Sequence, residues 1–252
     1  MNIAPWIVQV KDGEDTRYGI QVRDIQSAND GDIAISIATH YLLQGPGPYY
    51  VIDIGVDKGW WSLFSVEVNP NIKIDAFEPN PASYRNLQRY LDSTPQLHIH
   101  NVAISDHEGH ISFTEKEGES HSRDVSGTCI VPCTTLTSYI VNRAIHLIKI
   151  DTEGHELRIL PTLYPYLSQI QTIIFECSPH WYGDSKVESV KNTLPVLNYL
   201  HGHYTYMYVL SRRGNPEAIL IPTISDVEDM LDQIYSERTQ VDIVVTNTRL
   251  HA

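Results

Sequence analysis

The sequence predicts an α/β fold in which a mostly parallel sheet is covered by helices on both faces. Between residues 49 and 178, apolar runs of strand length alternate with segments whose apolar residues recur at helical spacing. These runs are apolar throughout, which is typical of strands that are buried on both faces of a parallel sheet. The 252 residues are 42% hydrophobic and 19% charged, a usage that excludes a disordered or fibrous chain.

Five segments are expected to form the strands of this sheet: 49–54, 72–77, 97–104, 146–151 and 172–177. Three helices are expected between or after them: 81–91, the stretch that follows Gly154, and 187–197. Asn80 is a suitable N-cap for the first helix and Pro81 suits its first position. Pro195 is expected to kink or shorten the third. Residues 32–43 are expected to be a helix, although alternating isoleucines there also fit a strand.

Several further segments have weaker signals. Residues 110–115 resemble a short extra strand, and 204–210 with 218–222 resemble a hairpin. Ser225 and Glu228 have the spacing of a capping box, and 241–247 is the last expected strand. The prediction is one domain over 1–252: an N-terminal arm and helix (1–48), a cofactor-binding core (49–177), and a part that completes the sheet (178–252).

The net charge and the cysteine content indicate which binding partners and which cellular compartment to expect. The net charge of −13 disfavours binding to nucleic acid or to an anionic membrane surface. The three cysteines are an odd number and too few for a disulfide framework, which favours a reducing compartment. No signal peptide is visible, and the uncharged stretch 33–52 is interrupted by a Gly-Pro-Gly-Pro turn. We therefore expect a cytoplasmic protein.

The loops that follow the strands carry the chemistry, because ligands of open parallel sheets bind beyond the carboxyl ends of the strands. Gly55 and Gly59 follow the first strand and allow close approach of a ligand. Alternatively, the two glycines only form a tight turn between strand and helix and bind nothing. Glu78 ends the next strand, about 20 residues further on, where an acid can accept hydrogen bonds from ribose hydroxyls. The spacing G-x-x-x-G is not that of dinucleotide binders, and no basic residue is placed to hold a pyrophosphate. A nucleoside without phosphates fits better, and S-adenosylmethionine is the common one.

Four blocks, VIDIGVDKGWWSLF, AFEPNPASYRNL, NVAISDHEG and LIKIDTEGHELRIL, resemble in order and spacing those of FkbM-type S-adenosylmethionine-dependent methyltransferases. The resemblance covers about residues 49–177. It implies the Rossmann-like class I methyltransferase fold, a seven-stranded, mostly parallel sheet in which the strand added last is antiparallel. We assign that strand to 241–247.

The resemblance also implies roles for individual residues. Asp53 and Gly55 would face the methionine part of the cofactor, Gly59 would open the following helix, and Glu78 would hold the ribose hydroxyls. The adenine would lie along Asn101, Val102 and Ala103, with the Val102 amide or the Asn101 side chain reading its polar rim.

Two positions depart from the family pattern. The family more often has Ala-Asn where this chain has Val56 and Asp57, and an aspartate where it has Thr137. Asp57 would repel the cofactor's carboxylate, unless it binds the ammonium group or Lys58 compensates it. Because of these departures, a second possibility is a catalytically silent binding protein with the same fold. A nucleotide-dependent oxidoreductase is a third possibility, which the glycine spacing disfavours.

The leading hypothesis is an enzyme that methylates a hydroxyl oxygen of a small molecule or glycan. Such a reaction needs a group that removes the acceptor's proton. Asp151 and His180 are the preferred proton acceptors, with Glu153 as an orienting partner. Alternatively, these residues have no catalytic role: Asp151 or Thr152 caps a helix, and His180 is a surface residue.

We expect no metal. His98 and His100, like His201 and His203, would point to one face of a strand, but neither pair has a third ligand at fixed spacing. Asp151 together with Glu176 could hold a magnesium-like ion, although nothing in the sequence demands it. Nothing in the sequence indicates an oligomeric state.

Overall fold

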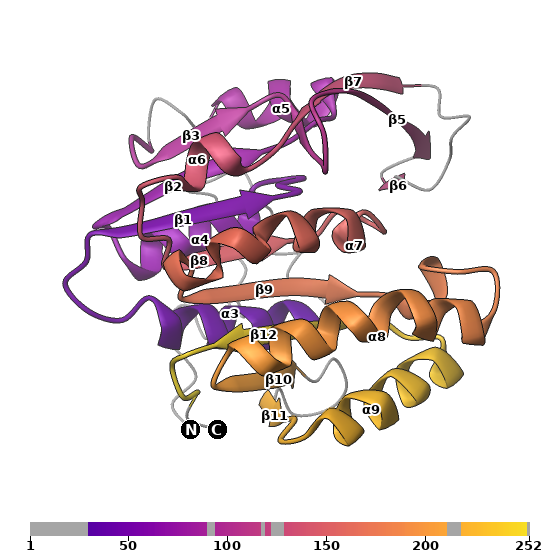
Figure 1. The fold of residues 1–252 in the computed structure, drawn as a ribbon. Coiled ribbons are helices and arrows are strands. Elements are labelled where there is room, and N and C mark those ends of the chain that lie inside the picture. Colours follow the sequence, from indigo (N-terminus) through magenta and orange to yellow (C-terminus); the bar gives the residue numbers. More distant parts are fainter. Residues whose placement is uncertain (1–29, 90–93, 117–118, 122–128, 211–217, 251–252) are drawn as a thin grey trace.

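The computed structural model describes residues 30–89, 94–116, 119–121, 129–210 and 218–250. Its larger sheet has eight strands in the order β11-β10-β12-β9-β8-β1-β2-β3 (Figure 1). These strands are β1 (Tyr49–Ile54), β2 (Ile72–Phe77), β3 (Leu97–His100), β8 (Leu147–Ile150), β9 (Thr172–Cys177), β10 (Tyr206–Leu210), β11 (Ala218–Leu220) and β12 (Val241–Thr246). Of the expected N-terminal arm and helix (1–48), residues 1–29 lie outside the described residues.

The pairing confirms the predicted α/β fold. Strands β3, β2, β1, β8 and β9 are parallel neighbours, and β12 pairs antiparallel with β9, as expected for 241–247. The expected number of seven strands is wrong by one. The hairpin predicted after β10 is present and adds β11 as an eighth strand, antiparallel to β10 at the sheet edge.

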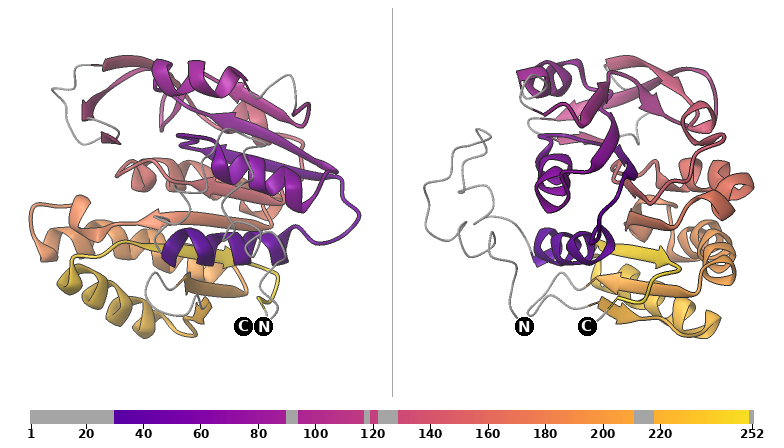
Figure 2. Two further views of the ribbon diagram at one scale, coloured as in Figure 1. Left: turned by 180° about the vertical axis from the view of Figure 1, so that it is seen from behind. Right: turned by 90° about the vertical axis from the view of Figure 1, so that its left-hand side faces the viewer.

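Helices cover both faces of this sheet. They are α3 (Asp30–Leu42), α4 (Trp60–Val68), α5 (Pro81–Leu87), α6 (Thr137–Ile140), α7 (Glu156–Ile159), the 3-10 helices η2 (Leu160–Gln169) and η3 (Pro179–Trp181), α8 (Lys186–His203) and α9 (Ile224–Glu237). Figure 2 shows α3 and α4 on one side of the sheet and α8 on the other. In the part of the chain that the structure describes, no helix is long and apolar enough to cross a membrane.

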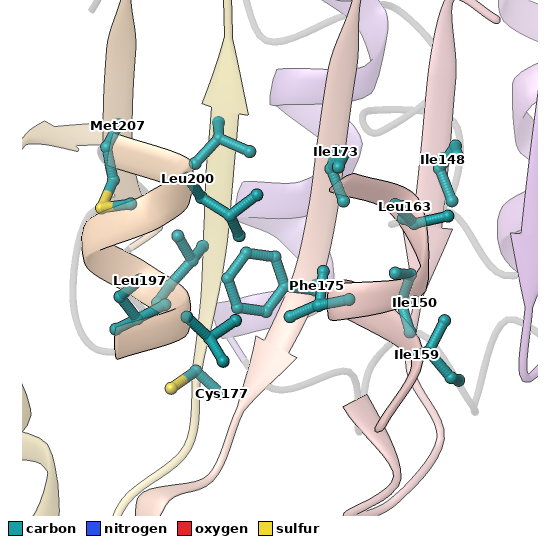
Figure 3. Packing of buried hydrophobic residues seen from close by; sticks show 14 of the residues in the cluster. Ile148, Ile150, Ile159, Leu163, Ile173, Phe175, Cys177, Leu197, Leu200 and Met207 are labelled. Carbon is teal, nitrogen blue, oxygen red and sulfur yellow. The ribbon is translucent and has the colours of Figure 1, made fainter. Parts of the chain in front are cut away.

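The core under α8 is built by side chains that alternate along the central strands. Ile148, Ile173 and Phe175 are at most 1% exposed and belong to one apolar cluster with Leu197 and Leu200 of α8 and Leu163 of η2. In Figure 3, Ile148 lies beside Leu163. Burying each such side chain is worth about 1.5–3 kcal/mol, so this face supplies much of the stability.

A second, smaller sheet has the order β4-β7-β5-β6. Its strands are β4 (Ala103–Ile104), β5 (Gly109–Lys116), β6 (Glu119–His121) and β7 (Cys129–Thr134). The single strand expected over 97–104 is therefore divided. The chain leaves the large sheet after β3, and β4 pairs instead with β7.

Several local predictions need correction. The capping box of α9 is formed by Thr223 and Asp226 and not by Ser225 and Glu228. Helix α8 continues through Pro195, because its flanking turns are buried against the sheet. The helix expected after Gly154 is only one turn of α-helix and continues as η2, which contains two prolines. The helix expected over 32–43 is confirmed as α3.

Candidate functional site

The site lies at the carboxyl edge of the parallel strands, and its first carboxylate is Asp53 on β1. This side chain is 1% exposed, and its Oδ2 accepts a hydrogen bond of 2.6 Å from Ser62. Among the described residues its Oδ1 has no hydrogen-bond partner, and this oxygen lies 3.7 Å from the Lys149 ammonium. Burial raises the pKa of Asp53, and the nearby ammonium opposes this shift. A buried carboxylate oxygen with unused acceptor capacity is suited to a ligand that carries N–H donors.

The glycine loop packs directly against the loop that follows β8. Gly55 has a φ of 81°, and a Cβ atom there would lie 1.7 Å from the carbonyl oxygen of Asp151. Gly59, with a φ of 82°, is the N-cap of α4. Gly55 is thus required first of all by the neighbouring backbone, which leaves no room for a side chain.

Glu78 is held against the same loop. It is 6% exposed, and its two carboxylate oxygens accept hydrogen bonds of 2.8 Å from the N–H groups of Asp57 and Asn80. Burial raises the pKa of Glu78 to about 7, although both hydrogen bonds favour the charged form. The acid expected to bind a ribose and the glycine loop therefore meet at one place.

The segment expected to border the adenine supports Glu78. The Asn101 amide donates to the carbonyl oxygens of Glu78 (2.8 Å) and Pro79 (3.0 Å). Val102 is half-buried, and Ala103 is buried at the start of β4. Both of these hydrogen bonds use the Asn101 side-chain nitrogen as donor. That Asn101 or the Val102 amide reads the adenine stays a prediction.

Lys149, on β8, is a site residue that the sequence reasoning missed. It is 5% exposed, and its ammonium lies 3.2 Å from Asp151 Oδ2, 3.4 Å from the Gly55 carbonyl oxygen and 6.0 Å from the centre of the Trp61 ring. Burial disfavours the charge, but the carboxylates of Asp151 and Asp53 outweigh it and raise the pKa of Lys149. The signal in the sequence was a lysine inside an otherwise apolar strand, since lysine is almost never buried unpaired.

Three carboxylates meet beyond β8 and β9. Oxygens of Asp151, Glu153 and Glu176 lie within 4.8 Å of one another. Glu176 is buried, and the Gln240 side chain donates a hydrogen bond of 2.6 Å to it. The structure thus brings together Asp151, one of the two predicted proton acceptors, and its predicted orienting partner Glu153. That no metal binds here stays a prediction.

Glu156 fixes the loop that carries this cluster. It is fully buried and accepts hydrogen bonds from the N–H groups of Thr152 (2.8 Å) and Gly154 (3.1 Å) and from the Tyr182 hydroxyl (2.9 Å). Burial raises the pKa of Glu156. The N-cap of α7 is His155, so the alternative in which Asp151 or Thr152 merely caps this helix is wrong.

His180 lies in η3, just after β9. Its ring makes an edge-to-face contact with Trp181, at 5.5 Å between centroids. Its role as a proton acceptor stays a prediction.

Comparison with known proteins gives a family-level match. A model described as the methyltransferase FkbM domain matches residues 53–212. Over 100 residues the chain is 28% identical to the 2-O-methyltransferase NoeI of Sinorhizobium fredii, an alignment that covers 39% of this chain. The chain spans only 41% of the length of that relative.

Similar solved structures are more distant. The precorrin-6y C5,15-methyltransferase of Geobacter metallireducens is 13% identical with a TM-score of 0.42, over 83% of this chain and 84% of the other. The plantazolicin methyltransferase BpumL, solved in complex with SAH, is 12% identical with a TM-score of 0.46, over 92% of both chains.

Proposed function

Because the chain belongs to the FkbM methyltransferase family, we propose that it transfers a methyl group from S-adenosylmethionine to a hydroxyl oxygen of a small molecule or sugar. The expected cofactor agrees with this family. One contact supports the proposal most directly: the Asp57 N–H donates to the Glu78 carboxylate at 2.8 Å. It holds the glycine loop and the acid of the next strand together, as a bound ribose would need.

The side chains at this edge fit the cofactor chemically. The unused Oδ1 of Asp53 suits the ammonium group of the methionine part. The buried carboxylate of Glu78 suits two ribose hydroxyls. In the part of the chain that the structure describes, this edge has more carboxylates than the buried ammonium of Lys149 can neutralise, and such a field favours a cationic ligand over a neutral one.

When bound, S-adenosylmethionine would supply a methyl group that is already activated by its sulfonium. Asp151 would accept the proton of the acceptor hydroxyl, with His180 as the alternative acceptor. Lys149, 3.2 Å from Asp151, would orient that carboxylate, and Glu153 would position the acceptor beside it. Glu156 would keep the loop in place through its hydrogen bonds to the backbone.

A catalytically silent binding protein is the second candidate, favoured by Asp57 and Thr137. Asp57 lies in the glycine loop with a φ of 48°, a conformation that suits an asparagine or glycine better. Thr137 begins α6, where the family more often has an acid.

Titration calorimetry with S-adenosylmethionine, S-adenosylhomocysteine and NAD separates these possibilities. We expect the first two to bind and NAD not to bind. Binding of NAD alone would contradict the proposal, and binding of none of the three would favour the silent protein.

A further inference from the structure

A groove lies between α9 and the β10–β11 hairpin, outside the site described above. Its volume is about 400 Å³, within the range of roughly 300–1,000 Å³ that is usual for small-molecule sites. Apolar side chains from both walls form its floor: Val209, Ile219, Ile221, Met230 and Ile234. Ile219 is 50% exposed, so the floor is accessible from solvent.

The rim of this groove is acidic. Asp226, Asp229 and Glu237 lie along one stripe of α9 and all line the groove, and among the described lining residues none is basic. A carboxylate or phosphate would be repelled by this rim, whereas a positive charge would be attracted. The combination of an apolar floor and an acidic rim fits a small molecule with an apolar body and an amine.

Gln240 connects one end of the groove to the proposed active site. Gln240 lines the groove, and its side-chain amide donates to Glu176 at 2.6 Å. Glu176 in turn belongs to the carboxylate cluster with Asp151 and Glu153. Val241 follows Gln240 and pairs with Cys177, which places this end of the groove at the carboxyl edge of β9.

We infer that this groove binds a small hydroxyl-bearing apolar amine and presents it to the carboxylate cluster as the methyl acceptor. The acceptor role rests on the proposed function, but the binding does not. In the transfer, the acceptor oxygen gives its proton to Asp151 and bonds to the methyl carbon, while the electron pair of the broken C–S bond returns to sulfur.

A matched pair of probes tests the binding. Tyramine and 4-hydroxyphenylacetate share a phenol ring and differ in the charge at the other end. Titration calorimetry of the full chain at low salt, without cofactor, should show tyramine binding about tenfold more tightly, since each partly exposed carboxylate contributes modestly. Asp229→Asn combined with Glu237→Gln should weaken tyramine binding about fivefold to tenfold. Glu228→Gln, on the same helix but outside the groove, is the control and should change nothing.

A second variant tests the floor. Ile219→Asn should weaken tyramine binding severalfold, whereas Ile130→Asn, at an exposed position on β7, should not. Equal affinity for both probes, no detectable tyramine binding by the folded wild type, or an equal effect of Glu228→Gln would overturn the groove as an amine site. If tyramine binds but receives no labelled methyl group from a cofactor shown to bind, the acceptor role is wrong. Failure of the cofactor to bind would instead contradict the proposed function and leave the tyramine result standing.

Discussion

On β1, β8 and β9, side chains on one face of the large sheet are apolar, whereas those near the carboxyl ends on the other face are charged. The apolar set comprises Ile52, Ile54, Ile148, Ile150, Ile173 and Phe175. The charged set comprises Asp53, Lys149 and Glu176, all at most 5% exposed. Because successive side chains of a strand point to opposite faces, the same three strands build a core on one side and a site on the other. A step of one residue along a strand therefore separates a side chain that stabilises the core from one that belongs to the site.

The largest effect should come from the apolar face. Phe175→Ala would remove a side chain that is 1% exposed, and should lower the free energy of unfolding by about 3–5 kcal/mol. Denaturant titration measures this loss, with Ile150→Val as a mild control at about 1 kcal/mol. Cofactor affinity of the folded variant should stay close to that of the wild type. A selective loss of cofactor binding would break the division between the faces.

Lys149→Met tests the charged face and should have the next largest effect. It leaves the carboxylates of Asp53 and Asp151 without their cation, which should cost about 3 kcal/mol of stability because a buried charge loses its partner. Unlike Phe175→Ala, it should also weaken cofactor binding.

Adding Asp53→Asn to Lys149→Met controls for the buried charge. The double variant should regain part of the stability and none of the cofactor affinity. If Lys149→Met were as stable as the wild type and bound cofactor equally well, the charged face would have no role in either property.

Glu78→Ala should act on binding more than on folding. Loss of its charge-assisted hydrogen bonds should weaken S-adenosylmethionine binding by about 1–3 kcal/mol. Calorimetry of variant and wild type at the same pH measures the difference. Unchanged affinity would remove Glu78 from the ribose site.

The smallest effect concerns pH. The pKa of Glu78 is raised in the folded protein to about 7 from an ordinary value of 4.5, so the folded state binds this proton more tightly than the unfolded chain does. Its contribution therefore stabilises the cofactor-free protein as the pH falls from about 7 toward 4.5, and is lost as the pH rises through about 7. Compared with Glu78→Gln, the wild type should gain about 1–2 kcal/mol between pH 7.5 and pH 5. Parallel stability curves for the two proteins would contradict the raised pKa.

Much of the central sheet could be predicted because its signals are local. The apolar runs of β1, β2, β8 and β9 have the length and composition of buried strands, and their order fixes which loops share an edge. Asp53 and Glu78 could be selected for the same reason, since both lie at the carboxyl end of such a run.

Other features depend on partners that are distant in the chain. The role of Lys149 arises from the pairing of β8 with β1, which brings its ammonium to Gly55, 94 residues away. The division of 97–104 depends on β7, whose pairing draws β4 out of the large sheet. At the start of α9, both Thr223 with Asp226 and Ser225 with Glu228 have the spacing of a capping box. Only the backbone and side-chain geometry at Thr223 shows which pair forms it.

The central claim is that S-adenosylmethionine lies across the ends of β1 and β2 with its ribose at Glu78. A crystal structure grown with S-adenosylhomocysteine tests it most directly. We predict that the Glu78 carboxylate accepts hydrogen bonds from the ribose hydroxyls and that the sulfur faces Asp151. Density for the ligand elsewhere, or a Glu78 side chain that makes no contact with the sugar, would contradict the account.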